Sequence, residues 1–178
     1  MKVSEQLEKD FYPTDKEIPH GYISGVYDTF FPDIRENAKL VLEVGVKGGG
    51  SIILWKDYFP NATIIGVDIE HCKQFSKPHH QDRVVEIVGN AYSKIILDCV
   101  PANLDVAIDD GSHKLDDIKF FVNNYYSKVK DGGYLFVEDI PHLEWIEEII
   151  GNNEYDYEIF DTREGLKSSD NILLMIRK

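Results

Sequence analysis

The segment Val41–Asp68, reading VLEVGVKGGGSIILWKDYFPNATIIGVD, constrains the fold of this chain more than any other stretch. An apolar strand, a glycine-rich turn, a helix and a second apolar strand follow one another directly, which predicts the first half of a nucleotide-binding βαβ unit. The glycines allow a sharp turn that approaches a ligand closely, and the helix N-terminus offers free N–H groups. Asp68 follows about 20 residues after the turn, where such units place a carboxylate for ribose hydroxyls.

The rest of the chain continues this alternation. We expect strands over residues 40–46, 62–67, 83–88, 105–108, 134–137, 155–161 and 171–177, and helices over 21–31, 51–58, 92–98, 115–129 and 142–150, with Pro32 ending the first helix. Strands that alternate with helices predict an α/β fold with a mostly parallel, seven-stranded sheet covered on both faces. The last connection, 162–170, is a polar loop, so the last strand should run antiparallel to its neighbour.

Length and charge narrow the functional classes. A chain of 178 residues with 43% hydrophobic residues predicts one domain, in which a polar arm and helix, 1–38, pack on a core, 39–178. The net charge of −13 disfavours nucleic acid and anionic membranes as partners. No apolar run is long enough to span a bilayer and no signal peptide is visible, so we expect a cytoplasmic protein. Cys72 and Cys99 have no metal or disulfide spacing.

Polar side chains follow successive strands of the predicted sheet. They are Glu43 and Gly45 after the first strand, Asp68, Asn90, then Asp109, Asp110 and His113, and finally Glu138 and Asp139. Carboxylates that converge on one edge of a sheet repel one another unless a cation neutralises them, and oxygen ligands with one imidazole suit Mg²⁺ better than zinc. The alternative is that individual acids are helix caps and solvated turn residues.

Here the sequence resembles a known family. The glycine-turn segment, DVAIDDGSHKLDDIKFF, DGGYLFVEDI and the upstream TDKEIPHGYISGVYDTFF are similar to class I S-adenosylmethionine-dependent methyltransferases, in particular metal-dependent macrolide-sugar O-methyltransferases and the related cephalosporin-hydroxylase-like group. The resemblance covers roughly residues 14–139. It implies a Rossmann-like methyltransferase fold, S-adenosylmethionine as cofactor and Mg²⁺ at the acidic edge.

The resemblance also implies roles for individual residues. Asp110 and Asp139 match the family's metal ligands and His113 its catalytic base. Residue Ile140 stands where related catechol-type enzymes have a further ligand, so the third protein ligand stays open, with Glu138 as a candidate. Lys47 stands where a small residue is common. Cofactor contacts are expected from Tyr22, Glu43, Gly45, Lys47, the Gly48–Gly49–Gly50–Ser51 turn, Asp68, Asn90 and Asp109.

These roles predict an O-methyltransferase for a hydroxyl of a sugar or another small molecule. A metal lowers the pKa of such a hydroxyl, and a histidine with an ordinary pKa of about 6.5 is suited to take its proton near pH 7. The rivals are an NAD-type oxidoreductase built on the same βαβ start, and a methyltransferase-like binding domain without catalysis. Little of the chain lies outside the core, so the acceptor pocket is expected to be shallow or completed by another subunit; a homo-oligomer stays open.

Overall fold

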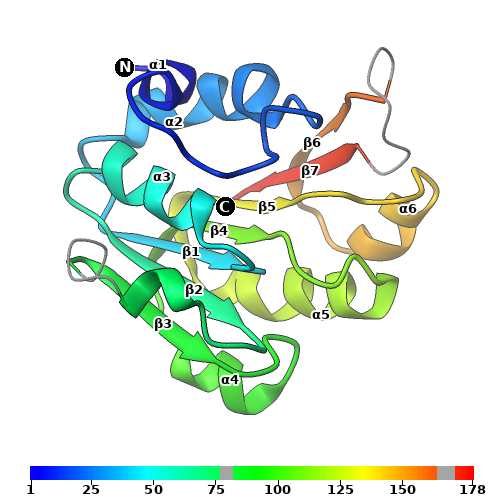
Figure 1. Ribbon diagram of the computed structural model, residues 1–178. Helices are drawn as coiled ribbons and strands as arrows, with labels where there is room; N and C mark the ends of the chain where they lie inside the picture. Colours follow the sequence, from blue (N-terminus) through cyan, green and yellow to red (C-terminus); the bar gives the residue numbers. More distant parts are fainter. Residues whose placement is uncertain (77–81, 164–170) are drawn as a thin grey trace.

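The computed structural model describes residues 1–76, 82–163 and 171–178. Its centre is a seven-stranded sheet in the order β3-β2-β1-β4-β5-β7-β6, with helices on both faces (Figure 1). The strands are β1 Leu40–Val44, β2 Thr63–Asp68, β3 Val84–Val88, β4 Leu104–Asp109, β5 Val129–Val137, β6 Asp156–Asp161 and β7 Ile172–Arg177. Strands β1 to β5 pair in parallel, and β7 runs antiparallel to both β5 and β6, which confirms the predicted fold class.

Two hydrophobic clusters fill the space between the sheet and its helices. On one face the sheet packs against α1 Val3–Leu7, the π-helix η1 Ile23–Tyr27, α2 Asp28–Ile34 and α3 Gly50–Tyr58. The other face packs against α4 Lys94–Cys99, α5 Leu115–Tyr125 and α6 Trp145–Ile150. Short 3₁₀ turns, η2 Lys73–Ser76 and η4 Tyr126–Lys128, complete the described elements. Both β-sheet faces are thus covered, so ligands can reach the sheet at its strand ends.

The N-terminal arm is more ordered than its polar sequence predicts. Residues 1–12 read as a polar arm in the sequence, and in the structure α1 forms there and buries Val3 completely, while Tyr12 packs into the same cluster. These two apolar side chains dock the short segment on the neighbouring helices. The division into an arm, 1–38, and a core, 39–178, stays a prediction.

Several boundaries differ from expectation, and two of these differences have a clear tertiary cause. Pro32 does not end the first long helix but lies inside α2, where the packing of Phe31 in the aromatic core outweighs the loss of one backbone hydrogen bond. Strand β5 begins at Val129 rather than Tyr134, because Val129 already pairs with Leu104 before a register shift. The histidines at 79 and 80 and most of the 162–170 loop lie outside the described residues.

Neither cysteine forms a disulfide, and Cys99 is exposed. Within the described ranges, no helix has the length and apolar character that a membrane crossing needs.

Candidate functional site

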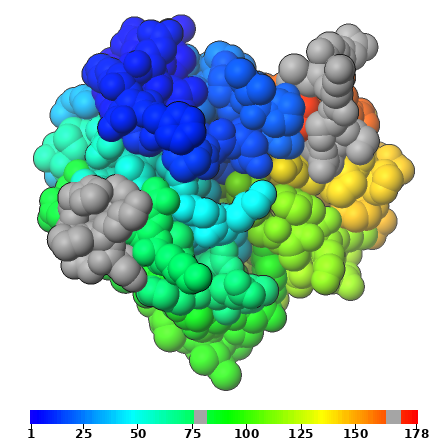
Figure 2. All heavy atoms as spheres, in the orientation of Figure 1, coloured from blue at the N-terminus to red at the C-terminus, as the bar shows by residue number. Residues whose placement is uncertain are grey.

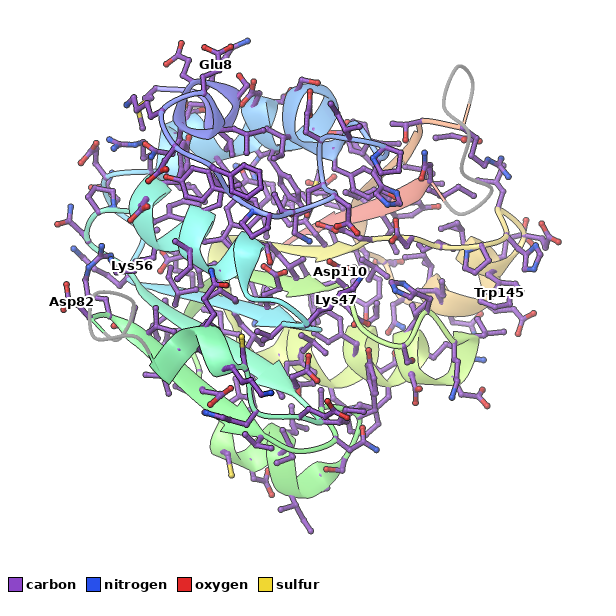
Figure 3. The ribbon with its side chains drawn as sticks, in the orientation of Figure 1. Glu8, Lys47, Lys56, Asp82, Asp110 and Trp145 are labelled. Atoms are coloured by element: carbon purple, nitrogen blue, oxygen red, sulfur yellow. The ribbon has the colours of Figure 1, made fainter. Side chains whose placement is uncertain are left out.

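A cavity of about 650 Å³ opens at the carboxyl ends of β1, β2 and β4. In Figure 2 the residues of the N-terminal segment (blue) adjoin those of the turn after β1 (cyan) in the middle of this face. Figure 3 places Asp110 and Lys47 near one another in the same region. Among the predicted site residues, the cavity is lined by Gly45, Lys47, Gly48, Gly50, Ser51, Asp68, Asn90, Asp110, His113 and Asp139. The pattern of polar residues at strand ends therefore identified one continuous surface.

The glycine turn is held in place from two sides. Gly45 has φ +87°, and a Cβ there would lie 1.9 Å from the carbonyl oxygen of Asp110, so this position requires glycine. Asp68 accepts hydrogen bonds through Oδ2 from the backbone N–H groups of Val46 and Lys47, at 2.8 Å each. Asp68 thus fixes the turn, in addition to lining the cavity where a ribose was predicted.

Glu43 supports the turn from inside the protein. It is fully buried and accepts hydrogen bonds from the Ser51 hydroxyl at 2.6 Å and from the Trp55 indole N–H. Burial raises the pKa of this carboxyl above its usual value. Glu43 is not among the residues that line the cavity, so its position favours a structural support of α3 over direct cofactor contact.

Asp110, His113 and Asp139 form a cluster at one side of the cavity. One ligand atom from each of them lies within 4.8 Å of the other two. His113 and Asp139 have φ of +54° and +53°, a left-handed conformation that non-glycine residues rarely adopt and that is concentrated at functional sites. The two turns after β4 and β5 therefore bend sharply to bring these side chains together.

Lys16 lies behind this cluster and carries no prediction from the sequence. Its side chain is 1% exposed, and its Nζ lies 2.7 Å from Asp110 Oδ2, 2.6 Å from Glu138 Oε2 and 3.4 Å from Glu43 Oε1. Burial alone would lower the pKa of Lys16, but the three carboxyl groups hold it well above its usual value. The lysine is an internal counter-cation for the acidic edge.

Glu138 follows the last residue of β5 and is 2% exposed. Its carboxyl group contacts Lys16 through Oε2 and accepts a hydrogen bond from the Tyr27 hydroxyl through Oε1. Burial raises its pKa well above the usual value, with Lys16 opposing the shift. Glu138 lies outside the group of Asp110, His113 and Asp139 that could share a metal ion, so its role as third ligand stays a prediction.

Asp109 and Tyr22 are predicted cofactor contacts that the structure places behind the cavity wall. The Tyr92 hydroxyl donates to Asp109 Oδ1 at 2.7 Å, and burial raises the pKa of Asp109 to about 7. The Tyr22 hydroxyl donates to Asp139 Oδ1 at 2.7 Å. Gly49, another predicted contact, has φ +79° and caps α3. Asp109 and Tyr22 thus contact the cavity-lining residues Tyr92 and Asp139 and do not line the cavity themselves.

Several known proteins with similar sequences are named as O-methyltransferases. The 8-demethyl-8-alpha-L-rhamnosyl tetracenomycin-C 2'-O-methyltransferase of Streptomyces olivaceus is 30% identical over 139 residues, 74% of this chain and 36% of the relative. The mycinamicin VI 2''-O-methyltransferase of Micromonospora griseorubida is 32% identical over 130 residues, 67% of this chain and 31% of the relative. A solved structure of the MycE methyltransferase from the mycinamycin biosynthetic pathway, in complex with Mg and SAH, matches with a TM-score of 0.75 and 23% identity, over 100% of this chain and 55% of that one.

The chain belongs to the class I S-adenosylmethionine-dependent methyltransferases. No family model matches the sequence. This methyltransferase chain spans about a third of the length of the curated relatives and about half of the solved one. Its sheet order, with an antiparallel β7, is the class I methyltransferase arrangement.

Both groups that the family implies fit the residues present. The glycine turn of this methyltransferase leaves open space at Gly48, where a Cβ would have no neighbour within 4 Å, and the N-terminus of α3 lies beside it. Asp110 and Asp139 offer two carboxylates, the oxygen ligands that suit Mg²⁺, with the His113 imidazole close by. The cavity therefore has room for a nucleoside cofactor beside a place for one divalent cation.

Sequence reasoning missed Lys16 and Tyr27 as parts of this site. Lys16 is separated from Asp110 by 94 residues and from Glu138 by 122. Tyr27 was assigned to the core by its helical spacing, and it is fully buried, yet its hydroxyl contacts Glu138. The one sequence feature that could have pointed to Lys16 is its place in the TDK segment, which resembles the family. Local periodicity does not show which distant carboxylates contact a buried lysine.

Proposed function

We propose that this chain transfers the methyl group of S-adenosylmethionine to a hydroxyl of a sugar or similar small molecule, with Mg²⁺ bound at Asp110 and Asp139. The observation that carries the proposal is the cluster of Asp110, His113 and Asp139 at the wall of a cavity that begins at the glycine turn. Support comes from relatives named as sugar O-methyltransferases and from a solved relative in complex with Mg, SAH and mycinamycin VI. These relatives lend no support to the oxidoreductase alternative.

Different residues of the cavity have different roles in the proposed reaction. The backbone of the glycine turn and the N-terminus of α3 bind the cofactor, and Asp68 fixes that turn. When bound, Mg²⁺ lowers the pKa of the acceptor hydroxyl and holds its oxygen in place. Most of the remaining acceleration comes from holding acceptor and donor in line, since methyl transfer needs little covalent help from the protein.

His113 is the proposed base. Its Nε2 lies 4.0 Å from Asp110 Oδ1, and the side chain is one-third exposed at the cavity, so an acceptor can reach it. The imidazole accepts the hydroxyl proton as the acceptor oxygen bonds to the sulfonium methyl carbon. The electron pair of the broken sulfur–carbon bond stays on sulfur, which leaves S-adenosylhomocysteine and a methyl ether.

Titration calorimetry with S-adenosylmethionine, S-adenosylhomocysteine and NAD, with and without Mg²⁺, tests the cofactor. We expect micromolar binding of both sulfur nucleotides and none of NAD. Tight binding of NAD instead would contradict the proposal. Binding of the sulfur nucleotides without turnover in a broad screen of sugars and small alcohols would favour the non-catalytic alternative.

The variant His113→Asn tests the base, because asparagine tolerates the left-handed backbone at this position better than most residues. With an acceptor from the screen, we expect turnover to fall by on the order of 10²–10⁴-fold while S-adenosylhomocysteine affinity is unchanged. Asp116→Asn, an exposed change in the first turn of α5, is the control. Wild-type turnover of His113→Asn would exclude the assigned role.

A further inference from the structure

A short N-terminal segment contacts both proposed metal-binding aspartates from their buried side. Lys16 and Tyr22, six residues apart, are 1% and 0% exposed, and neither is among the described residues that line the cavity. Asp110 and Asp139, by contrast, line it. The two carboxylates therefore have an inner side, which faces this segment, and an outer side, which faces the cavity.

Asp110 is held through one oxygen. Lys16 Nζ donates to Asp110 Oδ2 at 2.7 Å, and the same ammonium group is fixed in turn by Glu138 at 2.6 Å. The other oxygen, Oδ1, is the one nearer to His113, at 4.0 Å from Nε2. One oxygen of Asp110 is thus engaged by a fixed cation, and the second is directed toward the side of the cluster where His113 lies.

Asp139 is held in the same way by a different group. The Tyr22 hydroxyl donates to Asp139 Oδ1 at 2.7 Å and accepts a hydrogen bond from the Asp139 backbone N–H at 3.3 Å. His20 Nδ1 lies 3.2 Å from the same Oδ1. The hydroxyl therefore fixes both the side chain and the left-handed backbone of Asp139 and leaves Oδ2 without a described hydrogen bond.

We propose that Lys16 and Tyr22 are positioning residues that hold one oxygen each of Asp110 and Asp139, so that each carboxylate offers its other oxygen to a single divalent cation. The inference rests on the metal site of the proposed function. Groups that hydrogen-bond to metal ligands set the orientation of those ligands, and their removal typically weakens metal affinity 10- to 100-fold.

Tyr22→Phe tests this, and Tyr58→Phe is its matched control. Both tyrosines are fully buried and each hydroxyl donates one hydrogen bond, from Tyr22 to Asp139 and from Tyr58 to the backbone carbonyl of Met1, away from the cavity. Mn²⁺ affinity is measured on the protein without cofactor, from the electron paramagnetic resonance signal of free Mn²⁺. Circular dichroism verifies that each variant is folded.

We expect Tyr22→Phe to weaken Mn²⁺ binding by roughly 10- to 100-fold and Tyr58→Phe to leave it as in the wild type. Equal losses in both variants, or wild-type affinity in Tyr22→Phe, would overturn the positioning role alone. A wild-type protein that binds no Mn²⁺ would overturn the metal site as well, while S-adenosylhomocysteine binding would still report on the cofactor site.

A second measurement does not depend on the folding of a variant. In a crystal structure of the wild type with Mn²⁺, we expect coordination through Oδ1 of Asp110 and Oδ2 of Asp139, with Lys16 and Tyr22 still bound to the other oxygens. Bidentate coordination, or coordination through the oxygens that Lys16 and Tyr22 hold, would overturn the inference.

Discussion

At the scale of single residues, the acidic edge combines exposed and deeply buried carboxyl groups with different electrostatics. Asp110 is one-fifth exposed and beside a lysine, whereas its neighbour Asp109 is 2% exposed and its Oδ2 has no hydrogen-bond partner in the described structure. Burial raises the pKa of Asp109 to about 7, although the Tyr92 hydroxyl opposes the shift. The two adjacent aspartates thus differ in burial and in their hydrogen-bond partners.

The raised pKa of Asp109 predicts a pH dependence of stability. Between the usual value of 3.8 and about 7, the folded protein retains a proton that the unfolded chain has released. The free energy of unfolding should therefore fall as pH rises through this window and level off above about pH 7, with a contribution of about 1.4 kcal/mol per pH unit for one such proton. Asp109→Asn, which mimics the protonated carboxyl, should make the slope shallower.

Urea unfolding at a series of pH values between 4 and 8 measures this slope. Glu43, Glu138 and Asp139 also have raised pKa values, so part of the slope should remain in Asp109→Asn. Asp98→Asn, an exposed change on α4, serves as the control and should retain the wild-type slope. A wild-type slope in Asp109→Asn would mean that Asp109 is ionised in the folded protein at pH 5.

Part of the cavity lining could be predicted from the sequence, but the residues that lie behind the lining could not. Asp68, Asp110, His113 and Asp139 come at strand ends, and parallel strands bring those ends to one edge. Glu43 belongs to the same pattern but faces α3 instead, because the side chains of a strand alternate between the two faces. The buried partner, Lys16, lies outside every periodic element and gave no such signal.

At the scale of elements, the N-terminal segment, residues 1–34, packs against the carboxyl ends of the central strands through Lys16 and Tyr22. It begins with α1, crosses the edge at residues 13–22 and continues into η1 and α2. The Pro13 carbonyl lies beside Gly50, where a Cβ would approach its oxygen to 2.1 Å, so the segment also closes over the start of α3. Lys16 is its strongest electrostatic link to the core.

Lys16→Met should therefore destabilise the fold strongly. Removing the cation leaves the carboxyl groups of Glu43, Glu138 and Asp110 without their shared partner, and breaking a buried ion pair typically costs about 3–5 kcal/mol. Lys94→Met, which breaks an exposed pair with Asp98, should cost no more than about 0.5 kcal/mol. Chemical denaturation of both variants measures the difference; equal losses would contradict the role of Lys16 as counter-cation.

Element types could be predicted from periodicity more readily than boundaries. Hydrophobic residues recur about every 3.6 positions in a half-buried helix and every second position in a half-buried strand, so a short local window is enough to predict the element type. The start of β5 at Val129 depends instead on pairing with Leu104, and the passage of α2 through Pro32 depends on the aromatic core around Phe31. Both are tertiary effects that no local window contains.

At the scale of the whole molecule, the sheet order brings the ends of β1, β4 and β5 next to one another. The glycine turn follows β1, and the two proposed metal aspartates follow β4 and β5, so adjacent strands supply the two halves of the proposed site. The N-terminal segment adds the buried groups behind them. The fold thus places the proposed cofactor cavity beside the acidic cluster, as the proposed metal-assisted methyl transfer requires.

A crystal structure grown with S-adenosylhomocysteine and Mn²⁺, with an anomalous difference map, tests this account most directly. We predict one manganese peak between Asp110 and Asp139, on the His113 side, and the nucleoside along the glycine turn with its ribose near Asp68. A manganese peak elsewhere, or a nucleoside bound away from the turn after β1, would contradict the account.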